Sequence, residues 1–479
     1  MAIGSRSALR CTALVAGLVL LAAGGLLAAY AGHGLRSSSE SVDGVPVELV
    51  RPPGAASGRP AVVVAHGFAG SGRLMRPFAD TLARRGYVVA LPDLTGHGAN
   101  TRPLTGQDDV DHDLAAVIRY VRARPDVDPD RVTLVGHSMG AAAVVRAGSR
   151  DPRIAATVAI SLGDSTAATP PGPRRLLLVV GALEPAGIRS ATEAAATTGS
   201  RLVRVPLAEH VGVLYADRTH HETARWLDEA VGERPERTVI AAKQRVSAGA
   251  LVLAGALLLM TSGLRRRTAR PVLPPRETMG WIAGATVLAP LAGTAGGLLV
   301  SAGPQPSVCG YLIGYLGFAG LTLAAAAVVL HRPLRPRPPS WRSVAGATGL
   351  AVAGVATVLL PIQLGVTSAV PYGPHGWLVL FLALATALLL ASAHALAGPP
   401  WSILVLALVC LPLPAAAAVG LAPGFLALVA PLIAGLFAVH LLMAAPAWLS
   451  GTPWWRTVPA GAVMIAWPVA TALPLALSW

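Results

Sequence analysis

The chain has 479 residues, of which 53% are hydrophobic and only 13% are charged, and its formal net charge is +14. A mean hydropathy of +0.59 is too high for a wholly soluble chain and predicts membrane-spanning helices. The many large aliphatic side chains also exclude intrinsic disorder and collagen-like repetition.

The positive charge is concentrated in the second half of the chain. Residues 1–240 contain 26 basic and 23 acidic residues, whereas residues 241–479 contain 12 basic residues and a single acid, Glu277. The first half is therefore close to neutral, and the charge balance does not indicate a nucleic-acid partner. Together with the hydropathy, it predicts an N-terminal anchor (1–35), a soluble domain (36–240) and a helical membrane domain (241–479).

The N-terminal segment is expected to be a membrane helix. Arg6 and Arg10 precede an uncharged stretch, Cys11–Ala31, and about 20 such residues are enough to cross a bilayer. Ala29-Tyr30-Ala31 also resembles the small-residue site of a signal peptide, so a cleaved leader is the alternative. Both interpretations place the residues that follow outside the cytoplasm.

Residues 60–235 alternate short apolar runs with amphipathic or Ala-rich segments. The apolar runs are rich in Val, Ile and Leu and end at Gly, Pro or Asp, so they predict buried strands. We expect these strands at Ala61–Ala65, Tyr87–Leu91, Val132–Val135, Thr157–Ser161, Leu176–Val180 and Leu202–Val205. We expect helices at Leu74–Arg85, Val110–Arg124, Ala141–Arg150, Ile188–Thr198 and His220–Val231. Residues 32–60 suit a linker and an opening β-hairpin, and the alternation predicts an α/β fold with a parallel sheet covered on both faces.

From residue 244 onward, long apolar runs follow one another, and their length predicts about eight transmembrane spans in an all-α bundle. We expect these spans at 244–263, 279–301, 308–330, 343–366, 375–397, 400–420, 423–444 and 456–477. Arginines cluster after the first span, after the third and before the last. With the N-terminus inside, all three clusters lie on the cytoplasmic side, as the positive-inside rule requires. The same orientation makes residues 36–240 extracytoplasmic.

The three cysteines give no sign of a disulfide, a metal site or a cofactor. Cys11, Cys309 and Cys410 lie in or beside apolar stretches, and none has a neighbour at metal-ligand or redox spacing. We therefore expect no metal and no cofactor.

The strongest chemical signal is Gly136-His137-Ser138-Met139-Gly140, which follows an expected strand and precedes an Ala-rich helix. A serine at such a sharp turn needs small neighbours, here Gly136 and Gly140, because the backbone passes close to adjacent elements. The turn presents the hydroxyl at the sheet edge, next to the N-terminus of the helix. The pentapeptide therefore predicts a nucleophilic Ser138.

With these features, residues 45–235 resemble the α/β-hydrolase superfamily, in its dienelactone-hydrolase, compact-esterase or monoglyceride-lipase branches. The resemblance implies a doubly wound, mostly parallel sheet. His66-Gly67-Phe68 resembles the oxyanion loop of that family. It implies that the backbone N–H groups of Phe68 and Met139 form an oxyanion hole, which stabilises the charge that develops during acyl transfer.

The resemblance also implies an acid and then a histidine after the serine. Gly181-Ala182-Leu183-Glu184-Pro185 follows an expected strand and makes Glu184 the candidate acid, and Asp164 is the alternative. Pro206-Leu207-Ala208-Glu209-His210-Val211-Gly212 makes His210 the candidate base. The other histidines of expected helices, His112, His220 and His221, are expected on solvated faces.

The sequence therefore predicts a membrane-anchored serine hydrolase that cleaves carboxylic esters, thioesters or amides through an acyl-enzyme on Ser138. The short connection between Gly163 and Leu176 leaves no room for an inserted cap, so the domain is expected to be open. A small acyl ester or a lipid-like molecule, together with the bilayer, is the expected partner. An envelope acyltransferase and a non-enzymatic membrane protein with a hydrolase-like binding module are the alternatives.

Overall fold

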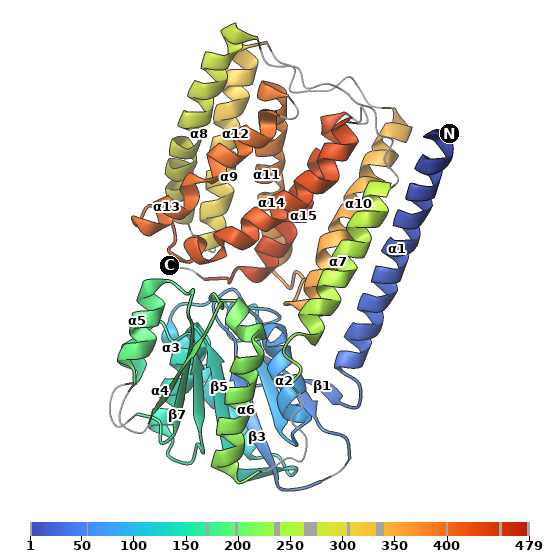
Figure 1. Cartoon of the computed structure of the whole chain (residues 1–479). Coiled ribbons are helices and arrows are strands. Elements are labelled where there is room, and N and C mark those ends of the chain that lie inside the picture. The colour runs from blue at the N-terminus through green and yellow to red at the C-terminus, as the bar shows by residue number, and fades with distance from the viewer. Residues whose placement is uncertain are drawn as a thin grey trace.

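The computed structural model describes residues 2–54, 56–168, 172–196, 200–233, 240–262, 275–303, 307–331, 340–398, 401–449 and 453–476. It contains an α/β domain and a layer of long helices stacked on it, with the C-terminus of the chain between the two (Figure 1). The N-terminus lies at the end of the helical layer that is remote from the α/β domain (Figure 1).

One eight-stranded sheet, in the order β1-β2-β4-β3-β5-β6-β7-β8, forms the centre of the α/β domain. Its strands are β1 (Arg36–Val42), β2 (Val45–Arg51), β3 (Arg59–Ala65), β4 (Val88–Pro92), β5 (Val127–His137), β6 (Thr157–Ile160), β7 (Leu176–Gly181) and β8 (Arg201–Val205). β1 and β2 form an antiparallel hairpin that joins β4, and strands β3 to β8 pair in parallel. The expected hairpin and parallel sheet are therefore confirmed.

Helices cover both faces of this sheet, as strands that are apolar on both sides require. The helices of the domain are α2 (Arg76–Ala83), α3 (Gln107–Arg122), α4 (Met139–Arg150), α5 (Ala186–Ala194) and α6 (Asp217–Val231). Successive residues of β3 point to opposite faces: Val63 packs in a cluster with residues of α3 and α4, whereas Val62 and Val64 pack with residues of α2 and α6. The prediction of a doubly wound α/β domain is confirmed.

The remaining helices form the helical layer. They are α1 (Ala2–Ala31), α7 (Gln244–Ser262), α8 (Arg276–Ser301), α9 (Ser307–Val329), α10 (Trp341–Gly365), α11 (His375–Ala397), α12 (Trp401–Cys410), α13 (Pro412–Ala418), α14 (Phe425–Leu449) and α15 (Val458–Ala472). Within the described ranges, eight segments are long and apolar enough to cross a membrane, one in α1 and seven after residue 240. Their length and composition are consistent with a membrane protein.

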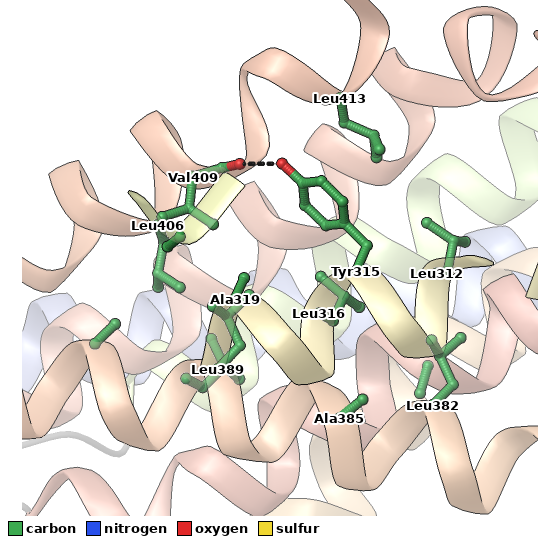
Figure 2. Packing of buried hydrophobic residues seen from close by; sticks show 14 of the residues in the cluster. Leu312, Tyr315, Leu316, Ala319, Leu382, Ala385, Leu389, Leu406, Val409 and Leu413 are labelled. Carbon is green, nitrogen blue, oxygen red and sulfur yellow. Dashed lines mark hydrogen bonds between the residues drawn. The ribbon is translucent and has the colours of Figure 1, made fainter. Parts of the chain in front are cut away.

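Figure 2 shows the packing at the centre of the helical layer, where leucines of α9 and α11 interlock. The Tyr315 hydroxyl, buried in this apolar region, donates a 2.6 Å hydrogen bond to the carbonyl of Val409 near the end of α12 (Figure 2). α12 ends at Cys410, directly before Leu411 and Pro412, because proline lacks the N–H that would continue the helix. The expected span at 400–420 is thus two helical pieces.

The last expected span, 456–477, is wrong in length. Among the described residues of this range α15 is the only α-helix, and its 15 residues are fewer than the roughly 20 that cross a bilayer. Leu473 leaves the helix in an extended conformation, and the following residues pair with the α/β domain instead. The Arg-rich segments after α7 and before α10 lie almost entirely outside the described residues.

The carboxyl ends of the parallel strands face the helical layer (Figure 1). After β3, the Ser71 hydroxyl lies 2.8 Å from that of Thr367, next to α10. After β4, the N–H of Leu104 donates to the carbonyl of Leu475 at 3.0 Å, and Ala476 continues this contact as a parallel bridge. The sheet edge at which α/β proteins bind ligands is therefore the edge that the helical layer partly covers.

Candidate active site

Ser138 occupies a sharp turn between β5 and α4. Its φ of 53° and ψ of −114° lie outside the regions that non-glycine residues favour, so the turn is strained. A Cβ at Gly136 would lie 2.2 Å from the carbonyl oxygen of Gly140, and one at Gly140 would lie 2.5 Å from that of His66. Glycine is thus required on both sides of the serine by close backbone approach.

His210 joins Ser138 to a carboxylate. Its Nε2 lies 3.2 Å from Oγ of Ser138, and its Nδ1 lies 2.8 Å from Oε2 of Glu184. The carboxylate accepts a hydrogen bond from Nδ1–H, which leaves Nε2 as the acceptor of the serine hydroxyl proton. The three side chains come from the turn after β5, the loop after β7 and the loop after β8, which all lie at one sheet edge.

Glu184 is buried and fully hydrogen-bonded. Its second oxygen, Oε1, accepts one bond from the Ser161 hydroxyl and one from the N–H of Gly181, each at 2.7 Å. These donors fix the carboxylate and compensate for the water that it loses on burial. The sequence analysis did not identify Ser161 as a residue of the site. The signal that could have indicated it is a hydroxyl at the carboxyl end of β6, beside β7, the strand that precedes the acid.

His137 fixes the loop that carries His210. Its Nε2 lies 3.0 Å from the main-chain oxygen of His210, and the two rings are 4.8 Å apart. Burial, with a smaller contribution from the charge of His210, lowers the pKa of His137 to about 3. His137 is therefore neutral near pH 7 and donates Nε2–H to that carbonyl.

The His66-Gly67-Phe68 segment lies against the turn at Ser138. Nδ1 of His66 contacts the carbonyl of Gly67 at 2.8 Å, and Nε2 accepts the N–H of Leu94 at 3.0 Å. Burial lowers the pKa of His66, so the ring is neutral and braces two loops. In the part of the chain that the structure describes, the N–H groups of Phe68 and Met139 have no hydrogen-bond partner, and that of Met139 begins α4.

The family model of the α/β hydrolase fold matches residues 60–202, which contain nearly all of β3, strands β4 to β7, the start of β8 and the turn at Ser138. This part of the chain is an α/β-hydrolase domain. The long helices add a second, helical domain to it.

Several known proteins are similar to parts of the hydrolase domain. Epoxide hydrolase A of Mycobacterium tuberculosis is 36% identical over 106 residues, which are 22% of this chain and 32% of that protein. The thermostable monoacylglycerol lipase of a Bacillus species is 46% identical over 46 residues, which are 10% of this chain and 18% of that protein. The chain thus spans a third or less of the length of these curated relatives.

Among solved structures, dienelactone hydrolase from Anabaena variabilis is similar to this domain at 23% sequence identity and a TM-score of 0.35. The similarity covers 42% of this chain and 100% of that one.

A cavity of about 580 Å³ opens beside Ser138 in the hydrolase domain. Apolar side chains form much of its lining: Phe68, Leu104, Val110, Met139 and Ala142. Arg146 also lines it, but its guanidinium is paired with Asp111 at 2.6 Å. The cavity is therefore suited to an apolar group placed next to the serine hydroxyl.

Asp164, the alternative acid, lines this cavity, and within the described chain it makes no hydrogen bond or ion pair with His210. Its Oδ1 accepts the N–H and the hydroxyl of Thr166 at 2.9 and 2.6 Å. Among the described residues, Glu184 is the acid whose carboxylate contacts His210. No group of three or more His, Cys, Asp or Glu side chains in the described ranges could hold a metal ion.

The expectation that His220 lies on a solvated helix face is wrong. His112 and His221 are exposed, but His220 is 1% exposed and stacks on Phe78 with the ring centroids 4.0 Å apart. Its Nε2 lies 2.8 Å from the carbonyl of Leu214. The residue belongs to the α2–α6 packing contact, because the apolar stripe of α6 is wider than its aliphatic residues alone indicate.

Proposed function

We propose that this protein is a membrane-anchored serine hydrolase that cleaves carboxylic esters through an acyl-enzyme on Ser138. The observation that carries the proposal is the continuous set of contacts from Ser138 through His210 to Glu184, at 3.2 and 2.8 Å. This is the arrangement of nucleophile, base and orienting acid that acyl transfer requires.

In the proposed reaction, Oγ of Ser138 attacks the ester carbonyl while Nε2 of His210 accepts the hydroxyl proton. Glu184 holds Nδ1–H and stabilises the imidazolium that forms. The alcohol leaves with the proton from His210, and Ser138 remains acylated. Water then attacks the acyl-enzyme with His210 as base, which releases the acid and restores the serine.

The N–H groups of Phe68 and Met139 are the proposed oxyanion donors. Both residues line the cavity beside Ser138, and both N–H groups lack a partner within the described chain. Fixed donors of this kind stabilise the tetrahedral oxyanion at no cost in reorganisation. The neutral His66 and the close packing of Gly67 against Ser138 hold the Phe68 loop in place.

We also propose that the hydrolase domain lies outside the cytoplasm. α7 begins beside the domain, where Arg245 pairs with Asp80, and the Arg-rich sequence follows the opposite end of this helix. The positive-inside rule places that opposite end in the cytoplasm. Accessibility of the hydrolase domain to an impermeant protease in intact cells tests this orientation; protection of the domain until the cells are lysed would refute it.

An activity-based fluorophosphonate tests the proposed nucleophile on the full-length protein. We expect rapid labelling of the native protein and none of Ser138→Ala. Ser149→Ala, which removes a hydroxyl from α4 outside the site, is the matched control and should label normally. Equal labelling of the native protein and Ser138→Ala would refute the assignment.

A further inference from the structure

Two leucines stand out on the surface of the hydrolase domain. Within its described residues, Leu183 and Leu207 are the exposed large hydrophobic side chains, at 60% and 88% exposure. The other exposed large hydrophobic residues of the described chain lie in the long helices or in the segments that join them. Isolated exposed leucines are common on proteins, but here both occur on the two loops that carry the acid and the base.

The two leucines belong to one structural unit. Leu183 directly precedes Glu184, and its N–H donates a 2.9 Å hydrogen bond to the carbonyl of Ala208, the residue after Leu207. Leu207 has a φ of 56°, in the left-handed region that favours glycine or asparagine. A leucine is thus held in an unfavourable backbone conformation with its side chain in solvent, and no contact within the described chain accounts for that choice.

The position of this pair relative to the helices suggests what covers it. Strands β3 to β8 are parallel, so the loops after β7 and β8 leave the same edge as the loops after β3 and β4. The loops after β3 and β4 touch the ends of the long helices, through the Ser71–Thr367 and Leu104–Leu475 contacts. The loops with Leu183 and Leu207 lie at the other end of the sheet, and both leucines are exposed at the sheet edge that faces the helical layer.

We propose that Leu183 and Leu207 insert into the surface of the bilayer that contains the helical domain. The substrate is then an acyl ester that resides in that bilayer. This inference rests on the proposed function. Two apolar side chains at the rim of the site gain free energy on entering the acyl boundary. The ester of a membrane lipid then meets Ser138 without leaving the bilayer surface, and its apolar part enters the cavity lined by Phe68 and Met139.

A fluorescent probe tests the contact without requiring catalysis. The background is the full-length protein with Ser138→Ala and with its three cysteines replaced by alanine. A single new cysteine is then introduced by Leu183→Cys or by Leu207→Cys, and it is labelled with the fluorophore nitrobenzoxadiazole. The protein is placed in nanodiscs of phosphatidylcholine and phosphatidylglycerol. Asp130→Cys, an exposed site near the opposite edge of the sheet, is the matched control.

We expect a blue-shifted emission and quenching by doxyl lipids at positions 183 and 207, and neither at 130. A water-like emission at all three positions would overturn the inference. Protection from iodide without quenching by doxyl lipids would also overturn it, because it would indicate contact with a second copy or another protein. Since this background lacks Ser138, these outcomes are independent of whether the protein is a hydrolase.

A kinetic comparison tests the substrate class. The ratio of activity on a diacylglycerol in nanodiscs to activity on a soluble short-chain nitrophenyl ester should fall about tenfold or more in Leu183→Gln/Leu207→Gln. Leu183→Met/Leu207→Met keeps the side chains apolar and should keep the ratio. Equal losses on both esters would overturn the inference, since the leucines would then only support the loops. Absence of activity on either ester in the native protein would instead refute the proposed function.

Discussion

Phe68 of the oxyanion loop packs edge-on against Phe425, at the start of α14, with the ring centroids 5.0 Å apart. A residue of the helical domain thus supports the loop whose N–H is a proposed oxyanion donor. The helical domain therefore packs against a loop of the candidate site.

This contact predicts that Phe425→Ala lowers kcat on a soluble ester about tenfold with little change in KM. Loss of an entire oxyanion donor costs about 100- to 1000-fold, and a loosened loop should cost part of that. Leu432→Ala, on the same helix but 55% exposed, is the matched control and should leave kcat within about twofold. An equal loss in both variants would mean that α14, rather than the aromatic contact, is responsible.

The second prediction separates the two candidate acids. Glu184→Gln should lower kcat about 1000- to 10,000-fold. The glutamine oxygen stays with the donors of Ser161 and Gly181, so its NH2 group faces Nδ1 of His210, favours the wrong tautomer and does not stabilise the imidazolium. Asp164→Asn, whose carboxylate bonds Thr166, should lower kcat less than about tenfold. Steady-state rates on a nitrophenyl ester measure both, and the reverse order of the two variants would make Asp164 the functional acid.

The third prediction concerns the hydroxyl of Ser161. Ser161→Ala removes one of the two donors to Oε1 of Glu184, and a lost bond to a buried carboxylate costs about 1.5–3 kcal/mol. We expect a lower melting temperature and a several-fold lower kcat on a nitrophenyl ester, because the carboxylate that orients His210 is then held by one donor fewer. Ser149→Ala, which removes a hydroxyl that bonds only within α4, is the control and should change neither quantity. A native melting temperature and kcat in Ser161→Ala would show that the bond has no role in the site.

The fourth prediction concerns pH. Burial lowers the pKa of His220 to about 4, below its ordinary value of 6.5, so the unfolded chain binds more protons between these values. The stability that neutral His220 supplies is complete above pH 6.5 and declines as the pH falls toward 4. In His220→Gln, the free energy of unfolding should fall less steeply with decreasing pH in this interval. The difference in slope from the native protein should be up to about 1.4 kcal/mol per pH unit. Thermal melts of the full-length protein measure it, with exposed His112→Gln as a control that should leave the slope unchanged.

The fifth prediction concerns the link between the domains. The buried carboxylate of Asp80 pairs with Arg76 and with Arg245 of α7, so Asp80→Ala leaves two guanidinium groups without it. We expect a destabilisation of about 3–5 kcal/mol. The exposed Lys243–Asp217 pair is the control, and Asp217→Ala should cost less than about 1 kcal/mol. Similar melting temperatures for the two variants would show that the buried pair does not stabilise the domain contact.

The parts of the fold that local patterns determine were predictable from the sequence. The β3 run Ala61–Ala65 is short and apolar, and the glycines around Ser138 have a steric reason that can be read from five residues. The order of Ser138, Glu184 and His210 along the chain then follows the order of the strands, so their meeting at one sheet edge could be expected as well.

The contacts between the domains could not be predicted, because they join residues far apart in the chain. Ser71 and Thr367 are ordinary polar residues that become partners only when α10 meets the loop after β3. The C-terminal segment is as apolar as a span, yet Leu475 pairs with the hydrolase domain as extended chain. Composition alone does not distinguish an apolar segment in lipid from one that covers another domain.

The measurement that tests the central claim most directly is mass spectrometry of the full-length protein, quenched with acid during turnover of a nitrophenyl ester and then digested. The account predicts the mass of the acyl group on the peptide that contains Ser138, and no acyl group in Ser138→Ala. Turnover that persists in Ser138→Ala, or an acyl group bound to a different residue, would contradict it.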